Sequence, residues 1–190
     1  FNYKHFWGDY QHYQISHGWY PHEIRIIRND PDIHSWKSAQ SFRRIPDFDG
    51  LNYRQKENTY KLKVAKTEAE IYHYGWVRPP HLMQNKKREF SVIHRGQKKA
   101  EEEYGKLSNE FDYGPLDRLA EFQGTHPKVM QDKIAEMDWK DKLQYSGKPD
   151  PRRQLHRHEK LSNRIITWIE QKLLGGYYLG GTGNYKLLDG

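Results

Sequence analysis

The amino-acid sequence predicts an α/β or α+β protein in which a strand-rich first third precedes helices. Two observations support this prediction. Residues 1–77 repeatedly alternate apolar and polar side chains with a period of two, which is typical of strands. From Pro79 onward, the apolar residues recur with the helical period instead. A run of strands followed by helices indicates part of an α/β or α+β architecture.

Composition divides the chain into three expected parts, and its 190 residues are compatible with a single domain. Residues 1–78 form a β-rich part, and residues 79–140 form a helical part that packs on it. Residues 141–190 form a polar connection, a C-terminal amphipathic helix and a glycine-rich tail. Because the sequence opens at Phe1 with alternating aromatics and no helix cap, we expect a fragment of a longer protein. A removed tag or an omitted disordered start would give the same opening.

Residue usage narrows the class of protein. The 14 Tyr, 7 Phe and 6 Trp indicate a folded chain, because disordered chains are poor in such rings. The lack of cysteine excludes disulfides and thiolate metal sites and permits a reducing compartment. We expect a cytoplasmic protein, with a peripheral position at the inner membrane as the alternative. No apolar run approaches the ~20 residues of a membrane span. The net charge of +7 is compatible with a nucleic-acid or phosphate-bearing partner. It is equally compatible with an ordinary protein surface, because acidic residues separate the basic ones along the chain.

Three segments of the first part alternate as strands do. Residues 22–28 ("HEIRIIR") place two isoleucines on one face, and residues 60–64 ("YKLKV") alternate apolar residues with lysines. Residues 69–77 ("AEIYHYGWV") form a third predicted strand, which the following prolines end. Residues 45–59 are expected to form a long loop, and loops of that length are often functional.

Four helices are predicted in the remainder. The first begins at Pro79 and Pro80 and ends at Gly96, and residues 115–122, 125–137 and 158–174 form the others. The apolar stripes that should dock these helices are Met83, Phe90 and Ile93 in the first, Met130, Ile134 and Met137 in the third, and Leu161, Ile165, Trp168 and Ile169 in the last. The tail that follows is rich in glycine and is expected to be mobile.

His73 is the polar residue whose setting in the predicted strand is most suggestive of function. Gly75, on the same face, leaves open space beside the imidazole, and a strand glycine often marks the close approach of a ligand. The opposite face is expected to carry Tyr72, Tyr74 and Trp76. The ring lies near the C-terminal end of the strand, where α/β sheets bind ligands. Neutral imidazole ligates divalent metals or contacts phosphate. A core histidine hydrogen-bonded to backbone explains the same pattern.

Other polar clusters offer alternatives of the same kind. Glu23 lies among basic residues, where a carboxylate is either a general base or a partner in a surface ion pair. Arg43 lies in "SAQSFRR", where its guanidinium either holds phosphate by bidentate hydrogen bonds or is solvated. His156 and His158 have no further ligand at metal-site spacing, so we interpret them as surface residues.

Several segments in order resemble the C-terminal portion of a bacterial family-2 glycosyltransferase. The resemblance rests on the blocks "WYPHEIRIIRND", "SAQSFRRIPDFDG", "KLKVA", "IYHYGWVRPPHLMQNK", "FDYG" and "GTHPKVMQ". Their order and spacing resemble that family from residue 1 to about residue 140. The final helix and "NYKLL" fit it loosely.

This resemblance implies the acceptor-side part of a GT-A fold and a sugar-transfer reaction. Such enzymes transfer a sugar from a nucleotide-sugar donor to a hydroxyl of a carbohydrate or glycan acceptor. The family holds the donor diphosphate with a divalent metal, Mg²⁺ or Mn²⁺, on an Asp-x-Asp motif that should precede Phe1. The metal and donor would thus be bound mainly by an upstream half, and the fragment alone is expected to be inactive.

The resemblance also assigns roles to individual residues. His73 occupies a place like that of the C-terminal histidine that helps to bind metal or diphosphate in GT-A enzymes. Glu23 is our candidate for the base that deprotonates the acceptor, because that task needs a carboxylate or an imidazole. The candidate substrate-binding residues are Arg43 and Arg78 for phosphate and Trp19, Tyr74 and Trp76 for stacking on sugar rings.

Two functions of other classes remain open from the sequence. A basic, aromatic nucleic-acid-binding module would bind RNA or single-stranded DNA with steep salt dependence, although the scattered charge makes nucleic acid the weaker expectation. A non-catalytic carbohydrate-binding domain would present tryptophan and tyrosine rings as a flat platform. The sequence does not indicate the donor sugar, the acceptor or the oligomeric state.

Overall fold

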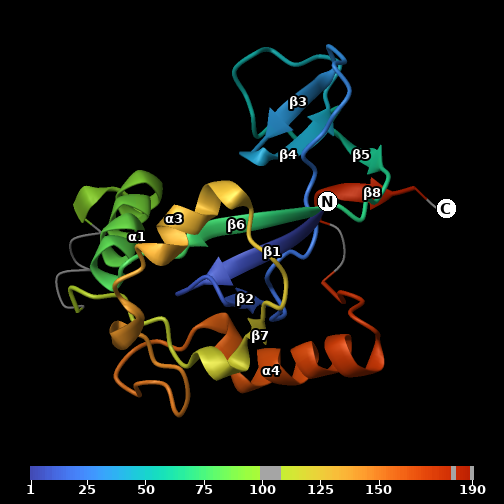
Figure 1. Cartoon of the computed structure of the whole chain (residues 1–190). Coiled ribbons are helices and arrows are strands. Elements are labelled where there is room, and N and C mark those ends of the chain that lie inside the picture. Colours follow the sequence, from blue (N-terminus) through green and yellow to red (C-terminus); the bar gives the residue numbers. More distant parts are fainter. Residues whose placement is uncertain (99–107, 181–182, 189–190) are drawn as a thin grey trace.

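The computed structural model describes residues 1–98, 108–180 and 183–188 (Figure 1). Within these ranges the chain forms two small mixed sheets with helices around the first of them. The predicted mixture of strands and helices is therefore confirmed. Strands dominate the first 78 residues and helices follow, although each of the two sheets also recruits one short strand from later in the chain.

The first sheet has the strand order β6-β1-β2-β7. Strands β1 (Asn2–Trp7) and β6 (Glu70–Trp76) run parallel, which places residues from the two ends of the strand-rich part side by side. Strand β2 (His12–Gln14) pairs antiparallel with β1, and the two-residue β7 (Ala120–Glu121) extends the sheet beyond β2. Among the described residues, β6 has a neighbouring strand on one side only.

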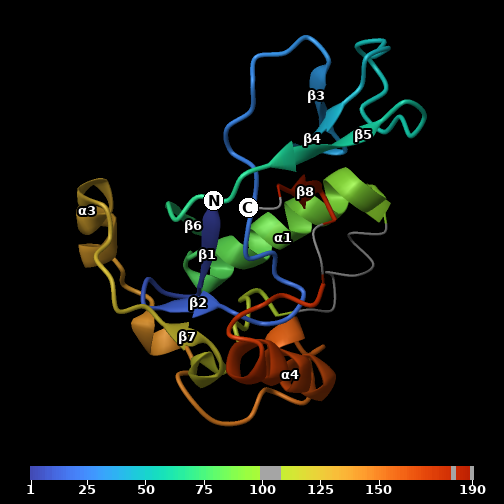
Figure 2. The same cartoon turned by 90° about the vertical axis from the view of Figure 1, so that its right-hand side faces the viewer.

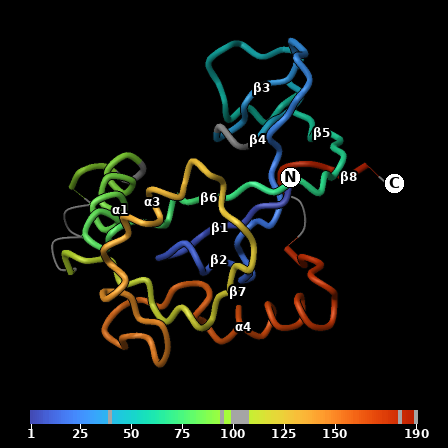
Figure 3. The backbone as a smooth tube through the Cα atoms, in the orientation of Figure 1, coloured from blue at the N-terminus to red at the C-terminus, as the bar shows by residue number. Residues whose placement is uncertain are grey.

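The second sheet has the order β3-β4-β5-β8 and stands apart from β1 and β6 in Figure 1. A hairpin joins β3 (Ile33–Trp36) to β4 (Ser38–Arg44), and β5 (Tyr60–Val64) lies antiparallel to β4. Strand β8 (Tyr185–Leu187) then pairs parallel with β5. The tail thus returns to the junction of the two sheets, beside the N-terminus (Figures 2 and 3). The expectation of a mobile tail is wrong for this strand.

A register shift separates the two ends of the β1–β6 pairing. His5 is paired with His73, whereas Trp7 is paired with Trp76, so β6 contains one extra residue between these positions. Such a bulge reverses the alternation of side chains beyond it. Strict alternation predicted Trp76 beside Tyr74, and the structure corrects this, because Trp76 instead packs 4.9 Å from Trp7, centroid to centroid.

Helix α1 (Pro80–Arg95) begins and ends where the sequence predicted. Pro79 occupies the N-cap position, and Gly96 ends the helix with a positive φ of 87° that disfavours other residues. Its expected apolar stripe is wrong, since only Met83 is buried, and Phe90 and Ile93 are 53 % and 76 % exposed. The neighbouring aromatics supply the rest of the core around Met83.

The later helices are shorter than predicted. Helix α3 (Gln131–Ala135) follows a 3₁₀ turn, and α4 (Leu161–Trp168) continues into a π-helical segment (Ile169–Leu173). Helix α4 lies along the β2–β7 side of the first sheet in both cartoon views (Figures 1 and 2). Its stripe of Leu161, Ile165 and Trp168 remains more than half exposed rather than docked on a described residue.

Two further predictions of secondary structure are wrong. Residues 22–28 have no strand beyond an isolated bridge at His22, and Ile26 is 76 % exposed. This segment connects the two sheets and pairs with β1 only through that bridge. Residues 115–122 form a 3₁₀ turn and strand β7 instead of a helix, because this segment completes the edge of the first sheet. The loop predicted for residues 45–59 is confirmed.

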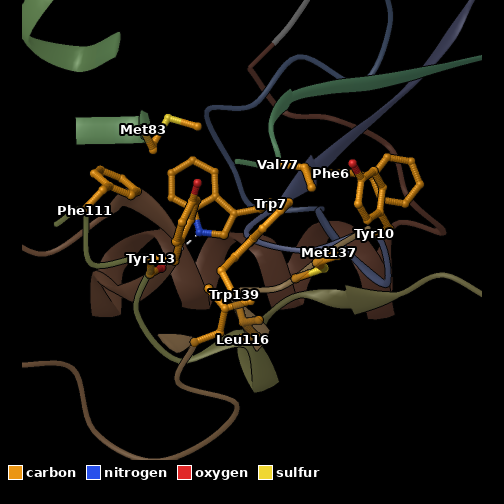
Figure 4. Close-up of a cluster of buried hydrophobic side chains, with 11 residues drawn as sticks. Phe6, Trp7, Tyr10, Val77, Met83, Phe111, Tyr113, Leu116, Met137 and Trp139 are labelled. Carbon is orange, nitrogen blue, oxygen red and sulfur yellow. Dashed lines mark hydrogen bonds between the residues drawn. The ribbon is translucent and has the colours of Figure 1, made fainter. Parts of the chain in front are cut away.

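The core is aromatic and centres on Trp7. Figure 4 shows its indole surrounded by Met83, Tyr113 and Trp139, and Nε1 of Trp7 donates a hydrogen bond to the carbonyl oxygen of Tyr113 at 3.0 Å. Trp139 donates in the same way to the carbonyl oxygen of Gly8 at 2.9 Å. The core therefore buries its indole N–H groups only where a backbone oxygen accepts them.

An ion-pair network fixes the segment before α4. Arg153 donates to Glu159 and Asp112, and the Glu159 carboxylate also accepts from the backbone N–H of His156. His158 is buried, and it accepts a hydrogen bond from the Gln14 side chain through Nδ1. The interpretation of His156 and His158 as surface residues is therefore wrong, because both rings pack against Trp7. None of the helices in the described ranges is long and apolar enough to cross a membrane.

Candidate functional site

Two histidines meet across the parallel strands of the first sheet. The pairing of β1 with β6 places His5 opposite His73, and their Nδ1 atoms lie 3.2 Å apart. His5 is buried, whereas His73 is half-buried near the end of β6. The C-terminal ends of parallel strands are where ligands bind in open sheets. The structure thus places His73 where the sequence predicted and gives it a partner.

The hydrogen bonds of this pair determine its tautomers. Nε2 of His5 lies 3.2 Å from the carbonyl oxygen of Tyr20, which only accepts, so Nε2 carries the proton of neutral His5. Nδ1 of His5 is then bare and accepts a hydrogen bond from Nδ1–H of His73. Neutral His73 has no second proton, so its Nε2 presents a lone pair. A lone pair of this kind is what a metal ion or an acidic proton requires.

The surroundings keep both rings neutral at ordinary pH. Burial is the main cause that lowers the pKa of His5 to about 4, and the neighbouring His73 lowers it further. Burial also lowers the pKa of His73, and the charges of Lys86 and Arg25 act in the same direction. Because neither ring is charged near neutrality, the tautomers described above are those that would meet a ligand.

Two cations flank His73. The Arg25 guanidinium hydrogen-bonds the hydroxyl of Tyr3 and lies 5.1 Å from the centre of that ring. Nζ of Lys86, from α1, donates to the carbonyl oxygen of Gly75 at 2.5 Å. Burial lowers the pKa of Lys86, and the nearby Arg78 charge adds to this effect. A neutral imidazole between two cations is a favourable setting for a multiply charged anion.

Two tryptophans form an aromatic wall beside the histidine pair. The Trp19 ring lies 5.0 Å from the His5 ring and 5.7 Å from the Trp76 ring, centroid to centroid. Trp76 reaches this group only because of the bulge in β6. His5 therefore lies between His73 and Trp19, and Trp19 in turn contacts Trp76, with both tryptophans half-buried.

Tyr74 lies on the opposite face of the sheet. Its ring stacks on Phe6 at 5.0 Å, and its hydroxyl donates to Nδ1 of His126 at 2.8 Å. Nε2 of His126 in turn lies 2.8 Å from the carbonyl oxygen of Tyr10, which fixes this tautomer as well. Burial raises the pKa of Tyr74 to about 12. The structure therefore separates Tyr74 from the predicted substrate-binding group and places it in a packed aromatic cluster.

Glu23 lies on the segment that leaves Tyr20 toward the second sheet. Its side chain is buried and accepts a hydrogen bond from the backbone N–H of Ile24 at 3.1 Å. Burial raises its pKa and outweighs both that hydrogen bond and the charge of Arg25, which act in the opposite direction. A raised pKa suits a general base, but no hydrogen bond in the described chain joins Glu23 to the histidine pair.

The two predicted phosphate-binding arginines lie far apart in the fold. Arg78 is exposed at the end of β6, where its charge lowers the pKa of Lys86, so it lies near the histidine site. Arg43 belongs to β4 of the second sheet and packs its guanidinium carbon 4.4 Å from the centre of the Trp36 ring. The structure therefore brings Arg78, and not Arg43, toward His73.

Sequence reasoning missed three members of this site, namely His5, Arg25 and Lys86. The alternation of Tyr3, His5 and Trp7 placed His5 on one face, but the parallel pairing with residues nearly seventy positions later has no local signal. Lys86 is one of two adjacent lysines in α1, and only the packing of that helix on the end of β6 selects it.

The described residues do not complete a metal site by themselves. No group of three or more histidine, aspartate or glutamate side chains within them is arranged to hold a metal ion. Nε2 of His73 is suited to supply one ligand, and any other ligands would have to come from elsewhere. Searches for related proteins found no matching family model, curated protein or solved structure.

Proposed function

We propose that the chain is the acceptor-side part of a family-2, GT-A type glycosyltransferase that acts in the cytoplasm. The observation that supports this most is the bare Nε2 of His73, which the His5 and Tyr20 contacts fix at the end of a parallel strand. The resemblance of the sequence blocks gives this histidine its role, namely contact with metal or donor diphosphate. The one-sided pairing of β6 is compatible with an upstream half that extends the sheet.

In this proposal, the residues around His73 bind the nucleotide-sugar donor. Arg25, Lys86 and Arg78 offset the negative charge of the diphosphate, and Trp19 and Trp76 contact the sugar. His73 would supply a nitrogen ligand to a divalent Mg²⁺ or Mn²⁺, and the other ligands would belong to the proposed upstream half. A bound metal would stabilise negative charge on the leaving diphosphate.

Glu23 remains the proposed base for the acceptor hydroxyl. Its buried carboxylate has a raised pKa, which favours uptake of a proton near neutral pH. The same burial is compatible with a purely structural carboxylate that caps the Ile24 N–H. Glu23→Gln distinguishes the two, because a base is lost while the shape and that backbone contact are kept.

The test is turnover of nucleotide sugars by the full-length protein with Mn²⁺ or Mg²⁺. We expect His73→Ala to lower kcat at least roughly a hundredfold, because it removes a ligand that contacts the donor complex. His81→Ala is the matched control, since His81 is exposed on α1. Unchanged kinetics of a folded His73→Ala protein would assign His73 to the core instead.

A second arm uses residues 1–190 alone. We expect no turnover of any nucleotide sugar by this piece, because it would lack the proposed donor-binding half. Measured turnover would contradict the proposal that donor binding needs an upstream half. The role of His73 would still be tested separately by His73→Ala.

A further inference from the structure

The second sheet carries a hollow of its own, distinct from the histidine site. It has a volume of about 510 Å³ and lies against β4, β5 and the segment before β8. Four of its eight lining residues are cationic, namely Lys37, Arg43, Lys56 and Lys61. The other four are Trp36, Thr59, Gly183 and Asn184, so no lining residue is acidic.

Arg43 adds a buried positive charge to the lining of this hollow. Arg43 as a whole is 4 % exposed, and its guanidinium donates to the hydroxyl of Ser41 and to the carbonyl oxygens of Phe42, Gly183 and Asn184. All of these acceptors are neutral. A buried charge is costly unless an opposite charge meets it, so an anion in the hollow would complete this arrangement.

Lys37, which also lines the hollow, has a strained backbone conformation. It occupies the tight turn between β3 and β4 with a φ of 62°, a left-handed conformation that favours glycine. Its Nζ lies 4.0 Å from the centre of the Trp36 ring, whose indole also packs against Arg43. Lysine at this position thus adds a charge beside Arg43 where folding alone would favour glycine, and such strain is often found at ligand sites.

We propose that this hollow binds a diphosphate group. The cationic lining matches a ligand with more than one negative charge, and the volume falls in the range of small-molecule sites and exceeds the needs of a single phosphate. Burial also lowers the pKa of Arg43, as expected for a guanidinium held out of water without an anion. This inference does not rest on the proposed sugar transfer, because it concerns the other sheet.

The test is calorimetric titration of the protein with inorganic pyrophosphate at low ionic strength. We expect Lys56→Gln and Lys37→Gly each to raise Kd roughly tenfold or more, since each removes a charge-assisted contact. Lys37→Gly also relieves the left-handed strain, so lost binding in that variant would not result from unfolding. Lys128→Gln is the matched control, as an exposed lysine outside both sites.

A pair of variants separates this hollow from the histidine site. Arg25→Gln should leave pyrophosphate binding at the hollow unchanged, whereas a loss of binding in Arg25→Gln but not in Lys56→Gln would overturn the proposal. Absence of measurable pyrophosphate binding, or equal weakening in Lys128→Gln, would overturn it as well. Failure of the His73→Ala test has no bearing on either result.

The source of the diphosphate is distinguished by a third measurement. Cosedimentation with phosphatidylcholine vesicles doped with diacylglycerol pyrophosphate tests a diphosphate group carried by a lipid. Vesicle binding that needs Lys56 and is reversed by pyrophosphate assigns the hollow to a lipid-borne ligand. Binding of pyrophosphate without vesicle binding assigns it to a soluble one, and either result supports the site.

Discussion

The single N–H of neutral His73 is directed at Nδ1 of His5, 3.2 Å away, rather than at solvent. His5 accepts this hydrogen bond because its own proton is committed to the carbonyl oxygen of Tyr20. A buried residue that no ligand needs to touch thus decides which nitrogen of the half-buried ring is available for chemistry.

The tautomers of this pair are directly measurable. We expect long-range ¹H–¹⁵N spectra near neutral pH to show His5 protonated at Nε2 and His73 protonated at Nδ1. Because burial lowers its pKa to about 4, the His5 ring should remain neutral until the solution approaches that pH. A His73 ring protonated at Nε2 would contradict the proposed site.

His5 should also be a positioning residue with its own kinetic signature. Under the proposed function, His5→Phe would keep the residues proposed to contact the donor but would remove the acceptor for Nδ1–H of His73. We expect activity to fall roughly 10–100-fold, with a changed pH profile, as is typical when the partner of a ligating histidine is lost. A fall in thermal stability with unchanged activity per folded molecule would indicate a structural role only.

Acid should destabilise the fold. His5 and the buried His158 have pKa values of about 4 and about 3, below the ordinary value of 6.5, so the unfolded chain binds more protons between these limits. The free energy of unfolding therefore falls as pH drops below 6.5, and His5 alone accounts for about 3 kcal/mol by pH 4. Urea unfolding at several pH values checks this, and a flat profile from pH 7 to 4 would contradict it.

Gly75 should be needed for the geometry of His73. A Cβ atom at this position would lie 2.7 Å from Cε1 of the His73 ring, which is closer than real contacts allow. We expect Gly75→Ala to push the imidazole away from His5 and to raise the pKa of His5 toward its ordinary value. Gly183→Ala is the control, because nothing lies within 4 Å of the corresponding Cβ. An unchanged His5 titration in Gly75→Ala would show that the ring adapts without breaking the pair.

Two phenylalanines test which part of the aromatic surface stabilises the fold. Phe6 is fully buried and packs on Tyr74 and Phe122, so Phe6→Ala should cost about 3–5 kcal/mol of unfolding free energy. Phe90 on α1 is 53 % exposed, and Phe90→Ala should change the stability by less than about 1 kcal/mol. Equal losses in denaturant unfolding would mean that the α1 surface is buried in solution.

Adjacent arginines offer a similar comparison for the ion pairs. Arg153 meets the fully buried Glu159 and the half-exposed Asp112, so Arg153→Leu should cost about 3–5 kcal/mol by leaving a buried carboxylate unpaired. Arg152 pairs with Asp150 at the surface, and its loss should change stability little. Thermal unfolding of the two variants should therefore differ clearly, and indistinguishable midpoints would show that water screens the Arg153 network.

Much of the fold could be predicted where local rules decide the structure. The two prolines and the glycine that bound α1 act through their own backbone geometry, so both ends of that helix were predictable. The β6 strand was equally clear from its alternation. Residues 22–28 alternate just as clearly but have no partner strand, and sequence alone does not reveal which strands find partners.

The candidate site was only partly predictable from the sequence, because sequence alone does not reveal which strands pair. His73 and Trp76 were identified from their strand, but the bulge that turns Trp76 toward Trp19 depends on pairing with β1. The resemblance assigned Arg43 to the same substrate-binding group as Arg78, and the topology places Arg43 on the other sheet. Contacts between residues distant in sequence decided each of these outcomes.

The pairing of β8 with β5 has a consequence for the order of events during synthesis. Leu62 is matched with Tyr185, so the second sheet lacks its last strand until nearly the whole described chain has been made. Loop closure over such a distance is slow compared with the formation of a hairpin. On the ribosome, the β3–β4 hairpin would therefore form before β8 is available, and the second sheet would keep an unpaired strand edge while the aromatic core assembles. The cationic hollow would be the last feature of the molecule to form.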